Sequence, residues 1–154
     1  MQSADFFEIA NYLVNGGVEL IKKHTSEAHL PIEFACIFCQ TQKEYDELTK
    51  VIQNLGKVIQ DTPTGYTYLL NDPIDTQAGK LKLVKIRKPD LTRKERGDTD
   101  FNTNYAEFKK KYRNKTGFEL VERDDFEMLR LSDSNFDVMV CFSNIPIGKT
   151  LSLK

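Results

Sequence analysis

One pattern of secondary structure, repeated along the chain, constrains the fold most. A strand is expected near residue 32, followed by a helix and three further strands, and the same order begins again near residue 98. The first copy has its strands at Ile32–Cys39, Lys57–Gln60, Tyr66–Leu70 and Leu81–Arg87. The second copy has them at Asp98–Thr103, Phe118–Arg123, Phe126–Leu131 and Phe136–Phe142. The repeat predicts an α+β fold with two βαβββ modules, at residues 32–89 and 98–143.

Each helix of the pattern begins at a capping-box sequence, in which a short polar residue precedes Glu or Gln by three positions. Thr41–Glu44 has this spacing before the first helix, and Asn104–Glu107 has it before the second. Gly56 and Gly117 follow the two helices, and glycine is the residue that most often ends a helix. These signals predict where both helices begin and end.

A further helix is expected before the repeat, because apolar residues recur with helical periodicity over residues 4–23. Gly16 and Gly17 lie in its middle, and each costs about 1 kcal/mol relative to alanine in a helix interior. We therefore expect a break or kink there. Residues 1–31 are interpreted as a helical extension of a single domain, 1–154, because a chain of 154 residues can bury a substantial core.

Composition argues against two classes of partner. The net charge is −1, which gives no overall attraction to nucleic acid or to a membrane surface. No apolar run reaches the roughly 18–20 residues that a membrane span requires. The first residues, MQSADFFEIANY, carry acidic side chains where a signal peptide carries basic ones. We expect a cytoplasmic protein.

Cys36 and Cys39 form a C-x-x-C sequence, which in other proteins supports redox or metal chemistry. Here the surrounding residues predict a strand, in which side chains three positions apart point to opposite faces. Thiols on opposite faces cannot form a disulfide without distortion. We expect these two residues, and Cys141, to be structural.

The segment RKPDLTRKERGDTDF, residues 87–101, holds five basic and four acidic residues between two expected strands. Alternation along these strands places Lys85 and Arg87 on one face, and likewise Asp98 and Asp100. The opposite faces carry apolar residues that can pack under helices, namely Val84, Ile86 and Phe101. The four charged side chains are then expected to face a shared cleft.

Two interpretations of this charge are open. In one, the arginines bind a small anion, since a guanidinium group holds carboxylate or phosphate through two parallel hydrogen bonds. The candidate ligand-binding residues are Arg87, Arg93, Arg96, Asp98, Asp100, Tyr66 and Arg130, the last two from other strands. In the other, the acidic residues pair with the three arginines of the segment and hold it as a crossover. Each exposed pair of that kind contributes about 0–1 kcal/mol.

The paired βαβββ order resembles the vicinal oxygen chelate, or glyoxalase-like, superfamily. It is most similar to the small YecM-like proteins of that group, around LGKVIQDTPTGYTYLLNDPI and KLKLVKIRKP. The resemblance covers residues 32–143. It implies two incomplete barrels that face each other around a cleft, where His and Glu side chains from the first and last strands often bind a divalent metal.

The corresponding positions of this chain lack histidine. They are Glu33, Phe34, Lys85, Arg87, Asp98, Thr99, Asp100, Val140 and Phe142. Lys85 and Arg87 occupy positions where an acidic ligand is usual, and their positive charge repels a metal ion. We therefore expect no metal and no other cofactor.

The sequence thus favours a metal-free protein of glyoxalase-like fold that binds a small, anionic molecule, with catalysis left open. One alternative is a metal-dependent lyase, isomerase or dioxygenase with Glu33 and Asp98 or Asp100 as ligands. The other is a protein–protein interaction module with a filled cleft. A homodimer is compatible with either alternative and with the favoured reading.

Overall fold

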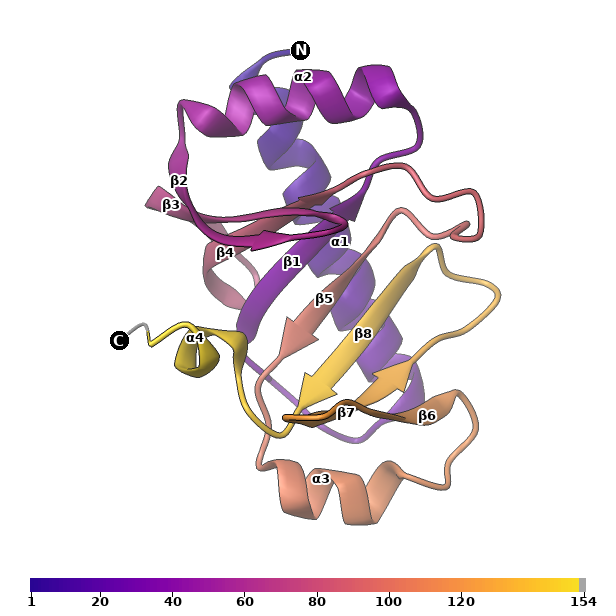
Figure 1. Ribbon diagram of the computed structural model, residues 1–154. Helices are drawn as coiled ribbons and strands as arrows, with labels where there is room; N and C mark the ends of the chain where they lie inside the picture. The colour runs from indigo at the N-terminus through magenta and orange to yellow at the C-terminus, as the bar shows by residue number, and fades with distance from the viewer. Residues whose placement is uncertain (153–154) are drawn as a thin grey trace.

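The computed structural model describes residues 1–152 and shows an α+β protein with one mixed eight-stranded sheet (Figure 1). The helices are α1 (Ser3–His24), α2 (Gln42–Gln53), α3 (Tyr105–Tyr112) and α4 (Ile147–Thr150). The strands are β1 (Ile32–Phe38), β2 (Gly56–Thr62), β3 (Gly65–Thr76), β4 (Gly79–Arg87), β5 (Gly97–Phe101), β6 (Phe118–Glu122), β7 (Glu127–Leu131) and β8 (Val138–Ser143). The predicted order of elements, strand–helix–three strands, occurs twice.

The sheet has the strand order β2-β3-β4-β1-β5-β8-β7-β6. Its centre is the antiparallel pair of β1 and β5, the strands that open the two copies of the pattern. On either side of this pair, β1 runs parallel to β4 and β5 runs parallel to β8. The two halves of the chain therefore meet along one line of backbone hydrogen bonds.

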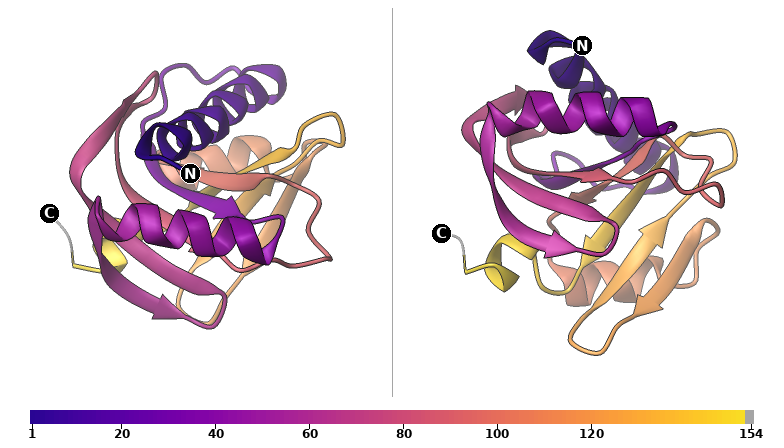
Figure 2. Two further views of the ribbon diagram at one scale, coloured as in Figure 1. Left: turned by 90° about the horizontal axis from the view of Figure 1, so that it is seen from above. Right: turned by 45° about the horizontal axis from the view of Figure 1, so that its top comes forward.

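Three helices cover one face of the sheet. Helix α1 runs across β1, β5 and β8, while α2 and α3 lie at opposite ends of the sheet (Figures 1 and 2). The main core lies between these helices and the sheet, and it contains Leu13 of α1, Ile52 of α2 and Phe108 of α3. Alternation along β1 places Ala35, Ile37 and Cys39 in that core. The residues between them, on the opposite face of β1, do not belong to this core.

The expected break at Gly16 and Gly17 is wrong, because α1 is one continuous helix. The two glycines instead allow the helix to approach the sheet closely. A Cβ at position 17 would lie 2.6 Å from Thr99 Oγ1, and one at position 16 would lie 2.9 Å from Val138 Cγ2. The propensity cost of glycine is thus offset by packing that a larger residue prevents.

The second capping box also differs from expectation. Thr41 accepts a hydrogen bond from Glu44 N at 3.1 Å, as a capping box requires, but Asn104 makes no side-chain cap to α3. Helix α3 is held by an aromatic cluster instead. Phe108 stacks at 4.3 Å from Phe142 and also contacts Tyr112 and Phe118. Tertiary packing replaces the missing local signal.

Strand β3 is longer than the expected Tyr66–Leu70, because it continues through Asp72 and Pro73 to Thr76. The pairing of β3 with β4 shifts register between Leu69 and Ile74. Proline is tolerated at such an irregularity, since the ladder there needs no donor from its nitrogen.

Replacing Gly17 with alanine tests the close approach of α1 to the sheet. We expect Gly17→Ala to lower the free energy of unfolding by about 1–3 kcal/mol in chemical denaturation, because overpacking against Thr99 and Phe101 exceeds the helix-propensity gain. Glu19→Ala, on the exposed side of the same helix, serves as the control and is expected to change it by less than about 0.5 kcal/mol. A stabilised Gly17→Ala protein would contradict this account.

Candidate functional site

A cavity of about 330 Å³ lies on the face of the sheet opposite α1. Phe34, Cys36 and Phe38 of β1 line it, and with Leu83 and Met139 they form a second, smaller core. These residues alternate with those of the main core, so the period of the strands explains why the central sheet is buried on both faces. Cys36 and Cys39 lie in different cores, as the strand alternation predicts.

Strand register brings the charged side chains together on this face. Cys36 of β1 lies between Lys85 of β4 and Asp98 of β5. Cys141 of β8 lies between Asp100 of β5 and Arg130 of β7. Together with Arg87, these charged residues line the cavity. The expectation that Lys85, Arg87, Asp98 and Asp100 share one face is therefore confirmed, and Arg130 joins them.

The two aspartates are unusual in their protonation. Burial raises the pKa of Asp98 to about 6, against the opposing effect of the cations Arg130, Arg87 and Lys85. Burial, and then the neighbouring Asp98, raise the pKa of Asp100 well above its ordinary value. At neutral pH Asp98 is mainly ionised, and Asp100 is shifted toward its protonated form relative to an exposed carboxyl.

Arg87 and Arg130 have few partners among residues 1–152. Arg87 Nη2 donates to Asp90 Oδ2 at 3.2 Å, and its guanidinium lies 5.0 Å from the ring centroid of Phe38. Arg130 Nη1 lies 3.5 Å from a carboxylate oxygen of Glu119, a mostly exposed residue. The Nε atoms of both arginines are buried without a hydrogen-bond partner in the described part of the chain. Such unsatisfied donors are uncommon in folded proteins and mark a site that a ligand can complete.

Lys85 contributes a third cation. Its Nζ donates to Thr64 Oγ1 at 2.7 Å, and burial lowers the pKa of the amine. None of the three cations lies within ion-pair distance of Asp98 or Asp100 in residues 1–152. The cations and the aspartates therefore line the same cavity without forming ion pairs with one another.

One side of the cavity is apolar. Phe126 and Met128 of the β7 region line it, together with Ile145 and Ile147 from the segment that leads into α4. Helix α4 is attached to β1, because Gly148 N donates to Glu33 Oε2 at 2.8 Å. Asn102 Nδ2 donates to the other oxygen of Glu33 at 2.9 Å. The carboxylate of Glu33 is thus occupied in holding the C-terminal segment.

These residues do not fit a divalent-metal centre. Glu33 is engaged by two protein donors, and Asp98 and Asp100 lie beside three cations. Within residues 1–152, no group of three histidine, cysteine or acidic side chains is arranged to hold a metal ion. His24 lies elsewhere, 2.8 Å from Asp133.

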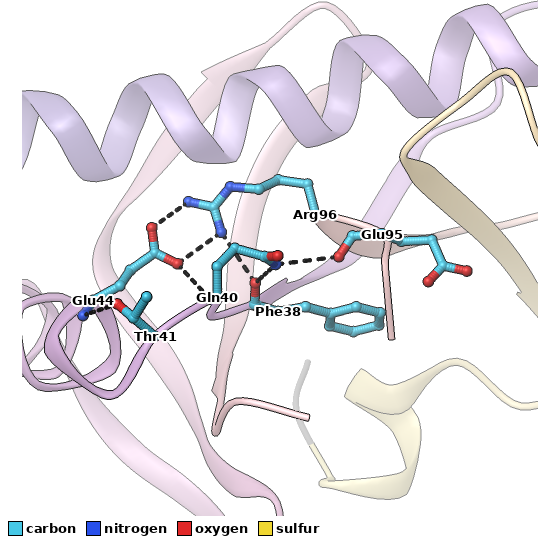
Figure 3. Close-up of polar contacts among 6 residues, drawn as sticks. All are labelled: Phe38, Gln40, Thr41, Glu44, Glu95 and Arg96. Atoms are coloured by element: carbon cyan, nitrogen blue, oxygen red, sulfur yellow. Dashed lines mark hydrogen bonds and ion pairs between the residues drawn. The ribbon is translucent and has the colours of Figure 1, made fainter. Parts of the chain in front are cut away.

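The predicted place of Arg96 is wrong. It was expected near Asp90, Asp98 or Asp100, but its guanidinium donates to both oxygens of Glu44, at 2.9 and 2.7 Å (Figure 3). It also donates to Phe38 O at 3.0 Å. Arg96 lies on the α2 side of the crossover because it binds the N-terminal turn of that helix, so it is absent from the cavity lining.

Two further candidates also lie outside the cavity. Arg93 is not among the lining residues, and its backbone N–H closes a turn onto Asp90 O at 3.0 Å. Tyr66 packs edge-on against Tyr68, with ring centroids 6.3 Å apart, and Tyr68 belongs to the main core. The alternation of β3 places Thr67, rather than Tyr66, toward the cavity.

Sequence reasoning missed several lining residues, including Cys141, Ser143, Phe126, Met128 and Ile147. The alternation within β7 and β8 could have indicated Met128 and Ser143, since they lie on the same faces as Arg130 and Cys141. No local signal indicates Ile147, because the position of α4 is set by tertiary contacts.

Comparison with known proteins gives a fold but no family. No family profile and no curated protein matches the chain. A solved structure titled "Structural Genomics, Protein EC4020" has a TM-score of 0.69 and 12% sequence identity, over 94% of this chain and 90% of that chain. The likeness shows a shared fold alone. Among residues 1–152, no helix has the length and apolar character needed to cross a membrane.

The contacts of Arg96 predict a structural role. Arg96→Ala is expected to lower the free energy of unfolding by about 2 kcal/mol, because it leaves the half-buried Glu44 carboxylate and Phe38 O without a donor. Arg93→Ala is the matched control, with an expected change below about 0.5 kcal/mol. Equal effects in urea denaturation would contradict the assignment.

The raised pKa of Asp98 predicts a pH-dependent stability change. In the unfolded chain the carboxyl ionises near pH 4, whereas in the fold it ionises near pH 6, so ionisation costs stability as pH rises through this window. Asp98→Asn should therefore match the native protein at pH 4 and exceed its free energy of unfolding by roughly 1–3 kcal/mol at pH 8. Lys85, Arg87, Arg130 and Asp100 face the same carboxyl and set the size of the effect.

Asp90→Asn provides a control of opposite sign. Hydrogen bonds from the hydroxyl and backbone N–H of Thr92 lower the pKa of Asp90, so its ionised form is favoured in the fold. This variant should lose stability relative to the native protein above pH 4. Denaturation curves at pH 4, 6 and 8 that show the same trend for both variants would refute the burial argument.

Proposed function

We propose that this protein binds a small anionic molecule in the cavity lined by Arg87, Asp98 and Arg130, and that it does so without a metal ion. In this proposal the two βαβββ segments are glyoxalase-like half-barrels, and the cavity is the cleft between them. The strand order, with β1 and β5 paired at the centre of one sheet, supports that arrangement.

The observation that carries the proposal is the state of the two arginines. Each places a guanidinium at the cavity and has only one acidic partner, at 3.2 Å for Arg87 and at 3.5 Å for Arg130, among the described residues. Each also has a buried Nε without a partner there. Because a carboxylate or phosphate accepts several hydrogen bonds from guanidinium groups, it would supply acceptors that the protein does not.

The charge balance favours an anion as well. Three cations, Lys85, Arg87 and Arg130, line the cavity with two aspartates. The cations outnumber the aspartates by one, and burial shifts Asp100 toward its uncharged form, so both features favour a net positive charge in the cavity. In a partly dehydrated cavity such an excess attracts an anion more strongly than it would in water.

The size and lining of the cavity favour a small organic anion over inorganic phosphate. Its volume of about 330 Å³ lies at the lower end of the range typical of small-molecule sites. Phe126, Met128 and Ile145 add apolar surface to the same lining as the charged residues. A ligand with an anionic head and a short apolar tail would use both.

The two alternatives drawn from the sequence are less well supported. The metal-dependent alternative needs Glu33 as a ligand, but both of its oxygens accept hydrogen bonds from the protein. The interaction-module alternative needs a cleft filled by side chains, whereas this cavity is open. Neither of them accounts for the unpartnered donors of the arginines.

A ligand screen by thermal shift tests the proposal. We expect at least one carboxylate or organic phosphate with an apolar tail to raise the melting temperature, by an amount that grows with its concentration. At 100 times the dissociation constant the gain corresponds to about 2.7 kcal/mol. Arg87→Ala and Arg130→Ala should each weaken binding at least tenfold, since each removes a charged hydrogen-bond donor.

Arg123→Ala is the control, because Arg123 is an exposed arginine of the same half of the chain that does not line the cavity. Its binding should be unchanged. A screen with no stabilising anion, or one whose best ligand stabilises the Arg87→Ala and Arg130→Ala proteins equally, would overturn the proposal.

A further inference from the structure

The aspartates of the cavity offer hydrogen-bond acceptors that an anion alone does not use. Asp98 makes no side-chain hydrogen bond within the described residues, and Asp100 accepts one long bond, from Ser143 Oγ at 3.4 Å. Both side chains nevertheless line the cavity. An acidic group in such a place is costly unless a donor meets it, because burial without a partner disfavours its charged form.

Asp98 is the acceptor available at neutral pH. Burial and the adjacent Asp98 both raise the pKa of Asp100, so Asp100 is the weaker acceptor of the two. Among the nearby cations, Arg130 acts most strongly on Asp98, and Arg87 comes next, although neither lies within 4.0 Å of it. The arginine donors and the Asp98 acceptor therefore line one cavity without forming a direct ion pair.

We propose that the ligand is a small 2-hydroxy carboxylate with an apolar tail. Its carboxylate lies between Arg87 and Arg130, and its hydroxyl group donates a hydrogen bond to Asp98. This inference rests on the proposed function and adds the chemical class of the ligand. A 2-hydroxy acid carries its donor on the carbon next to the carboxylate, so one small ligand can offer both groups to the arginines and Asp98, which line the same cavity.

The charge of the cavity selects a hydroxyl over an ammonium group. Either group could donate to Asp98, but Lys85, Arg87 and Arg130 all surround the same space. A positive charge on the ligand would be repelled by these three cations, whereas a neutral hydroxyl is not. The site is then specific in two ways. Asp98 favours a ligand that carries a hydrogen-bond donor, and the cations disfavour a ligand whose donor is positively charged.

The apolar lining sets the rest of the ligand. Phe34 and Phe38 line the cavity together with Phe126, Met128 and Ile145. A tail of the size of a phenyl or isobutyl group would bury against these side chains. The proposed ligand therefore has three parts, which are a carboxylate, an adjacent hydroxyl and an apolar tail.

Matched pairs of compounds separate the hydroxyl from the carboxylate. The probes are 3-phenylpropanoate with 3-phenyllactate, and 4-methylpentanoate with 2-hydroxy-4-methylpentanoate, measured by isothermal titration calorimetry at pH 7.5. We expect the hydroxy acid of at least one pair to bind roughly tenfold more tightly, as a hydrogen bond to a charged acceptor allows.

In Asp98→Ala this ratio should fall to about one while binding of the plain acid is kept. Asp98→Asn, which preserves the shape of the side chain, should lower the ratio severalfold and covers the case in which the alanine variant does not fold. Glu119→Ala is the matched control, because Glu119 is an acidic partner of Arg130 that lies outside the cavity. Its ratio should equal that of the native protein.

Each result decides between the two proposals. Plain acids that bind as tightly as their hydroxy acids, or a ratio that survives in Asp98→Ala, would overturn this inference and leave anion binding intact. Phenylalanine binding more tightly than 3-phenyllactate would overturn the choice of a neutral donor. If no acid of either kind binds but the thermal-shift screen finds another anion, this inference fails and the proposed function stands; if the screen also finds none, both fail.

Discussion

The antiparallel pairing of β1 with β5 is the contact on which the rest of the structure depends. It joins the two halves of the chain through backbone hydrogen bonds at the centre of the sheet. Its register places Asp98 beside Cys36 and Asp100 beside Phe34. Because side chains alternate along a strand, a shift of one residue would turn both aspartates into the helix-covered core. The geometry of the cavity is thus a consequence of one strand pairing.

The crossover between β4 and β5 holds β5 in register with β1. Its own ion pairs do not involve Asp98 or Asp100. Arg96 binds Glu44 and Phe38 O on the α2 side (Figure 3). Arg87 binds Asp90 instead. Gly97 follows directly, where a Cβ would lie 2.3 Å from Cys36 O, so only glycine allows β5 to approach β1. Asp98 and Asp100 remain outside the ion pairs of the crossover and face the cavity.

The cavity gathers features that a purely structural surface would avoid. Two aspartates have raised pKa values, and two arginines have buried donors without partners in the described residues. Each feature costs stability, and such costs concentrate where a protein binds or transforms a ligand. A carboxylate with an adjacent hydroxyl would satisfy the arginines and Asp98 together, which is why we favour that class of ligand.

The sequence by itself determined the order of elements and the faces of the strands, because both follow from local periodicity. Lys85, Arg87, Asp98 and Asp100 could be assigned to one face, since alternation needs no knowledge of neighbours. Tertiary structure decided what lies across from each face. Arg96 binds Glu44 of α2, and Tyr66 packs with Tyr68 on the helix side of the sheet. Gly16 and Gly17 allow the close packing of α1 on the sheet and do not break the helix. These outcomes depend on residues distant in the chain, which local pattern cannot supply.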